Sequence, residues 1–110
     1  MGTLYYGAAQ AAIVVDDRTL AHLKTVATSK LRRNESFLVS WEEAVENGSG
    51  RGSIWLHPAT DLLYRFEGSR APELDPELLE SMSMASMSGR GIVIEASLLA
   101  MTPRRYAVAG

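Results

Sequence analysis

Helical periodicity is clearest between residues 17 and 32. Five apolar residues fall at helical spacing there and define one buried face; they are Leu20, Leu23, Val26, Ala27 and Leu31. Asp16 and Asp17 stand directly before them, where an aspartate accepts hydrogen bonds from free amides and offsets the positive helix end. The pattern predicts a helix over residues 17–32.

A second helix start is indicated by residues 75–77, Asp-Pro-Glu. They combine a capping residue, a proline in the first turn and an acid near the positive helix end. We expect this helix to run to about Ser88, with Met82 in the core. Met84 and Met87 either fill the core or form an adaptable contact surface for another chain.

Alternation with a period of two indicates strands, because successive side chains of a strand point to opposite faces. The strongest case follows Ser36, where Phe37, Val39 and Trp41 alternate with their neighbours. Further strands are expected at residues 4–6, 12–15, 53–57, 62–67 and 91–95. The strands at 4–6 and 12–15 would form a β-hairpin, and the strand that begins at Phe37 would form an antiparallel meander with those at 53–57 and 62–67.

The predicted elements follow the order ββαβββαβ. This order indicates an α+β domain with a mainly antiparallel sheet and two helices packed on one face. We expect residues 1–95 to form a single α+β domain. Residues 96–110 are expected to be a C-terminal extension or tail, because clear signals end at Ala96.

Composition narrows the class of protein. The 110 residues suffice for one domain with a core, and 46% hydrophobic and 22% charged residues are typical of globular chains. The absence of cysteine excludes disulfides and a thiol nucleophile. No signal-like pattern opens the chain and no apolar run is long enough for a membrane span, so we expect a cytoplasmic protein with no membrane partner.

Catalytic and metal-binding motifs are missing from the sequence. The two histidines, His22 and His57, have no metal-ligand spacing and no Gly-x-Ser-x-Gly motif nearby. The glycine-rich stretch 48–52 lacks a P-loop pattern and favours a flexible hairpin loop. We therefore expect no catalytic residue, no metal and no cofactor. An enzymatic alternative would require a pocket around His57.

Positive charge gathers locally, although the formal net charge is −2. The candidate binding surface consists of Lys24, Lys30, Arg32, Arg33, Trp55, His57 and Tyr64. If these side chains converge, the cations would contact phosphates and the aromatic rings would stack on bases. The alternative is a solvated helix face whose charges pair with nearby glutamates.

Three stretches carry a family resemblance: residues 16–23 (DDRTLAHL), 30–37 (KLRRNESF) and 53–58 (SIWLHP). They resemble a group of small actinobacterial proteins of unknown function that are often labelled ATP-dependent DNA ligase. The label implies an adenylated lysine in a Lys-x-Asp-Gly motif. Neither Lys24 nor Lys30 stands in such a motif, so ligase catalysis is rejected and only an association with DNA survives from the label.

Two functions are favoured over the enzymatic alternative at His57. The first is a non-catalytic interaction domain that forms a homo-oligomer, or binds another protein, through a sheet edge or the Met-bearing helix. The alternative is a nucleic-acid-binding accessory protein that uses the basic end of the first helix. The lack of a coherent active site motivates the first, and the local positive charge motivates the second.

Overall fold

The computed structural model describes residues 1–43 and 50–100. The helices are α1 (Asp17–Arg32) and α2 (Pro76–Ala85), and the strands are β1 (Gly2–Tyr6), β2 (Ala11–Val15), β3 (Phe37–Glu42), β4 (Arg51–Leu56), β5 (Leu62–Arg65), β6 (Ile92–Glu95) and β7 (Ser97–Ala100). The α+β class and the predicted order of elements are confirmed. The proposed loop at 48–52 lies partly outside the described residues.

The strands form two sheets rather than one meander. One sheet has the order β5-β1-β2-β7 with antiparallel pairs throughout, and the other has the order β4-β3-β6. In the second sheet β3 is antiparallel to β4 and parallel to β6. The predicted hairpin of β1 and β2 is confirmed.

The meander is wrong in one pairing, because β5 pairs with β1 and not with β4. The chain turns sharply after β4, where the Thr60 amide donates to the His57 carbonyl and Pro58 has no amide to continue the ladder. The Gly7 amide then bonds to the Asp61 carbonyl and leads β5 into the other sheet.

Strand β7 was not indicated by the sequence. Residues Ser97–Ala100 pair with β2, so the sheet continues beyond Glu95. Residues 101–110, the rest of the predicted tail, lie outside the described residues.

Both helices begin where the sequence predicts. Asp16 accepts a hydrogen bond from the Thr19 amide (3.1 Å) and Asp75 accepts one from the Glu77 amide (3.0 Å). Helix α2 ends at Ala85, earlier than expected. The Ser88 hydroxyl donates to the Ala85 carbonyl (2.8 Å). This carbonyl therefore has a hydrogen-bond partner, which a backbone amide of a further helical turn would otherwise supply.

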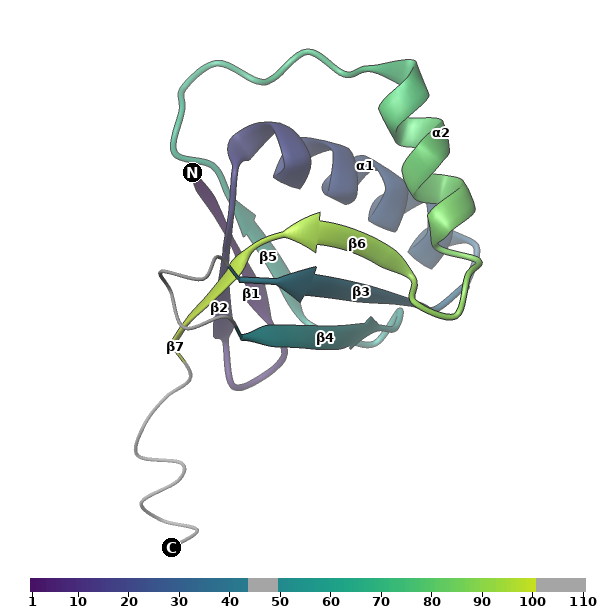
Figure 1. The fold of residues 1–110 in the computed structure, drawn as a ribbon, viewed down its shortest axis with the longest axis horizontal. Helices are drawn as coiled ribbons and strands as arrows, with labels where there is room; N and C mark the ends of the chain where they lie inside the picture. The colour runs from purple at the N-terminus through teal and green to yellow at the C-terminus, as the bar shows by residue number, and fades with distance from the viewer. Residues whose placement is uncertain (44–49, 101–110) are drawn as a thin grey trace, which may run out of the picture.

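One hydrophobic core joins both sheets and the helices. Figure 1 shows α1 lying over the strands, with α2 against its far end. The most deeply buried large side chains include Leu4, Leu20, Phe37, Leu56 and Ile92, and α2 adds Met82 as predicted. Within the described residues, no helix is both long and apolar enough to cross a membrane.

Candidate functional site

A connecting segment, residues 66–75, leads from β5 to α2 and crosses one end of α1 (Figure 1). Its first part is fixed by Asp17, the first residue of α1. One carboxylate oxygen of Asp17 accepts from the Gly68 amide (2.9 Å) and the other from the Glu67 amide (3.3 Å). The hydrogen bond from Gly68 is the main reason that the pKa of Asp17 is lowered.

The far end of the connecting segment is held by His22. This side chain is fully buried, and its Nε2 atom accepts from the Asp75 amide (2.8 Å). Its Nδ1 atom lies 2.6 Å from the Arg18 carbonyl, so the bonding partners assign a neutral ring with the proton on Nδ1. Arg18 also pairs with the Asp75 carboxylate (3.2 Å), and the segment is therefore attached to α1 at both ends.

A groove of about 820 Å³ lies between the outer face of α1 and the connecting segment. Its floor is made of small helix residues, Ala21, Thr25, Thr28 and Ser29, and its walls include Phe66, Pro72 and Leu74. Four cationic residues also line it: Lys24, Arg32, Arg33 and Arg70. No carboxylate from the described part of the chain lines this groove.

The four cations differ in how firmly they are held. Lys24 Nζ lies 5.8 Å from the centroid of the Phe66 ring, in a cation–π contact. Arg33 bonds to Glu35 (3.0 Å) and to the Ser29 hydroxyl (2.8 Å). These hydrogen bonds to Glu35 raise the pKa of Arg33 and lower the pKa of the Glu35 carboxyl.

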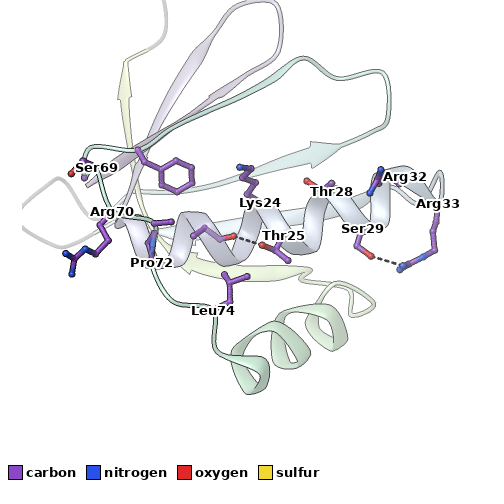
Figure 2. A pocket seen from close by; sticks show the side chains of 14 residues that line it. Lys24, Thr25, Thr28, Ser29, Arg32, Arg33, Ser69, Arg70, Pro72 and Leu74 are labelled. Atoms are coloured by element: carbon purple, nitrogen blue, oxygen red, sulfur yellow. Dashed lines mark hydrogen bonds between the residues drawn. The ribbon is translucent and has the colours of Figure 1, made fainter.

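Arg32 and Arg70 form no ion pair with any other described residue. Figure 2 shows Lys24, Thr28 and Arg32 along one side of α1, with Arg70 turned away from the helix. Arg32 is thus a cation free to meet a ligand within the groove, whereas Lys24 contacts the Phe66 ring and Arg70 stands at the rim.

Acidic side chains gather elsewhere on the molecule. A separate hollow of about 600 Å³ is lined by Asp16, Glu42, Glu43 and Glu95 together with Met1. The lining of the groove is therefore more basic than the net charge suggests. Across residues 1–43 and 50–100, no cluster of three or more histidine or carboxylate side chains is placed to hold a metal ion.

A family model described as domain of unknown function DUF7882 matches residues 1–97. The chain belongs to this family. The DUF7882 match includes α1 and the whole connecting segment, so both sides of the groove lie within the family domain. No curated protein and no solved structure gives a significant match to the chain.

The candidate surface expected from the sequence is divided in the DUF7882 structure. Lys24, Arg32 and Arg33 come together in the groove. Lys30 does not line it, because its side chain is only 10% exposed and pairs with Glu35 at 3.1 Å. Tyr64 packs against the core, and burial raises its pKa to about 12.

Trp55 and His57 also lie away from the groove. Trp55 is 53% exposed on β4, a strand of the other sheet, and makes a cross-strand pair with Leu38. His57 is exposed in the turn after β4, where its Nδ1 atom accepts from the Ala59 amide (3.0 Å). His57 is not among the residues that line the groove.

Sequence reasoning missed Phe66 and the hydroxyl residues of the groove floor. Thr25, Thr28 and Ser29 carry no signal of their own, because small polar residues are ordinary on an exposed helix face. Their role depends on the path of the connecting segment. The hydrogen bonds that Asp17 and His22 accept from the Gly68 and Asp75 amides set this path, and they span more than fifty residues.

Proposed function

We propose that the DUF7882 domain is a non-catalytic binding domain whose groove holds a nucleic acid. The observation that carries this proposal is a groove lined by four cations and no carboxylate among the described residues. Phosphate groups are bound by lysine, arginine and hydroxyl side chains, and each neutralised phosphate releases counterions. The residues of the groove match this chemistry.

The lack of a nucleophile paired with a base supports a non-catalytic role. The hydroxyl of Thr25 donates to the Ala21 carbonyl of its own helix (3.0 Å), and no histidine lines the groove. Nucleophilic catalysis by a hydroxyl needs an adjacent base to take its proton. The groove is therefore suited to holding a ligand. A cytoplasmic location is part of this proposal, as is the association with DNA that the resemblance to proteins labelled as DNA ligases implies.

Fluorescence anisotropy tests the proposal with labelled single-stranded and duplex DNA at low and moderate salt. We expect binding that weakens steeply with salt. Lys24→Ala and Arg32→Ala should each weaken binding and lower the slope of log affinity against log salt by about 1. Arg33 is a poorer choice for substitution, because its contacts with Glu35 and Ser29 also shape the end of α1.

Arg51→Ala is the matched control for this experiment. It removes the same charge from an exposed residue of β4, which does not line the groove. Its binding and salt slope should equal those of the unaltered protein. An absence of binding at low salt would refute the proposal, as would equal losses in Arg51→Ala and Arg32→Ala.

A second candidate function is self-association. It is favoured by two methionines of α2 and the turn after it, since Met84 is 63% and Met87 75% exposed. Exposed methionines form adaptable apolar contacts. Sedimentation over a range of concentrations should show a mass that rises in the unaltered protein and stays monomeric in a Met84→Gln, Met87→Gln variant. A monomeric mass at all concentrations would exclude this candidate.

A further inference from the structure

We propose that the groove takes a single strand of nucleic acid, with one base stacked on Phe66 and the neighbouring phosphates bound by Lys24 and Arg32. This inference rests on the proposed function and specifies its ligand. It is carried by the aromatic ring in the groove wall and by the row of side chains along α1.

The Phe66 ring is half-buried in the groove lining. It packs against the hydrophobic core on one side and lines the groove on the other. Its only aromatic-face partner among the described residues is the Lys24 ammonium, 5.8 Å from the ring centroid. A cation at this distance from a ring makes a weak contact when it is exposed. A base can therefore displace Lys24 from the ring while the ammonium turns to a phosphate of the same strand.

The spacing along α1 fits a strand that follows the helix. Lys24, Thr28 and Arg32 are four residues apart and therefore form one row on the helix surface, as Figure 2 shows. The separation of eight positions between the two cations corresponds to about 12 Å of helix. One strand of a duplex has a phosphate about every 3.4 Å along the axis, and an extended single strand has its phosphates further apart, so the row reaches a few phosphates at most.

The shape of the groove favours a single strand over a duplex. Proteins that read a duplex insert a helix or a β-ribbon into a groove of the DNA. Here α1 is the floor of a hollow, and the connecting segment rises beside it. Phe66 lies in the wall of this hollow and reaches only bases that are not stacked within a duplex. Aromatic side chains beside a positively charged groove are typical of single-strand binding.

The test compares three labelled ligands by anisotropy: a short single strand, an abasic strand with the same number of phosphates, and a duplex of the same sequence. We expect the single strand to bind roughly five- to a hundredfold more tightly than the abasic strand, as stacking of one base predicts. The duplex should bind no more tightly than the abasic strand. This comparison uses the unaltered protein and needs no variant.

Phe66→Leu then locates the stacking surface. Leucine keeps an apolar side chain against the core but provides no ring. Single-strand affinity should fall to the level of the abasic strand, and abasic affinity should stay unchanged. Trp55→Leu is the matched control, because it removes an exposed aromatic side chain on the other sheet and should leave all three affinities unchanged.

The outcomes separate this inference from the function on which it rests. Equal binding of the single and abasic strands would overturn base stacking and leave a groove that binds phosphates. Tighter binding of the duplex than of the abasic strand would also overturn the inference. A loss of single-strand binding in Trp55→Leu instead of Phe66→Leu would move the site to β4. No binding of any ligand would overturn both proposals.

Discussion

At the scale of single residues, His22 links α1 to the connecting segment that forms one side of the groove. The ring is fully buried and bonds to the Arg18 carbonyl and the Asp75 amide. Replacing it with alanine leaves a cavity and removes the acceptor of the Asp75 amide. We expect His22→Ala to lower the free energy of unfolding by about 2–4 kcal/mol in urea titrations. His57→Ala should change it by less than about 1 kcal/mol, since His57 is exposed; equal effects would contradict this role of His22.

Gly91 is a second residue whose replacement should lower the stability of the fold. It has a positive φ of 72°, and a Cβ atom there would collide with the carbonyl oxygen of Leu38. Gly7 has a similar φ of 74° with no atom near the added Cβ. Alanine at Gly7 should therefore cost about 1–2 kcal/mol of stability for the backbone alone. Alanine at Gly91 should cost clearly more in the same thermal unfolding assay. Similar losses in both variants would show that the contact with Leu38 relaxes easily.

At the scale of elements, local signals predicted the helices well and strand pairing poorly. The start of α1 was evident because Asp16 and the apolar spacing agree, and the observed bounds match residues 17–32. Helix α2 ended early because serine hydroxyls bond to its last carbonyls. The partner of β5 could not be predicted. Alternating residues define the two faces of a strand but not its neighbour, and β1 lies more than fifty residues away in the sequence.

Asp17 makes a testable link between α1 and the connecting segment. Hydrogen bonds from the Gly68 and Glu67 amides favour its charged form and lower its pKa. A carboxylate with a lowered pKa stabilises the fold above its unfolded pKa, about 3.9 for aspartate, and loses this effect as the pH falls through the folded value. Asp17→Asn should therefore be less stable than the unaltered protein at neutral pH, and the difference should shrink in acid.

Urea titrations between about pH 7 and pH 3 measure this dependence. Glu67→Gln is the control, because its exposed side chain contacts only the N-terminal amine (3.6 Å) among the described residues. It should show a smaller difference at neutral pH. A difference for Asp17→Asn that stays constant down to low pH would mean that the charge of Asp17 has no part in holding the segment.

At the scale of the whole molecule, the sequence indicated some of the cations that line the groove. Lys24, Arg32 and Arg33 could be grouped because helix periodicity brings them near one another. The wall that turns this helix face into a groove depends on Asp17 and His22, whose contacts with residues 67–75 have no local signature. Tyr64 was misplaced for the same reason, since its burial follows from the pairing of β5 with β1.

Strand β7 gives the last prediction, because the sequence suggested that the fold ends before it. Residues Ser97–Ala100 extend the sheet at β2, where Leu98 faces Ile13 in the register. A chain that ends at Ala96 loses these backbone hydrogen bonds and exposes the edge of β2. Compared with a chain that ends at Ala100, it should melt roughly 4–8 °C lower for each kcal/mol lost. Calorimetry of the two forms isolates β7, and identical melting temperatures would show that the strand adds nothing to stability.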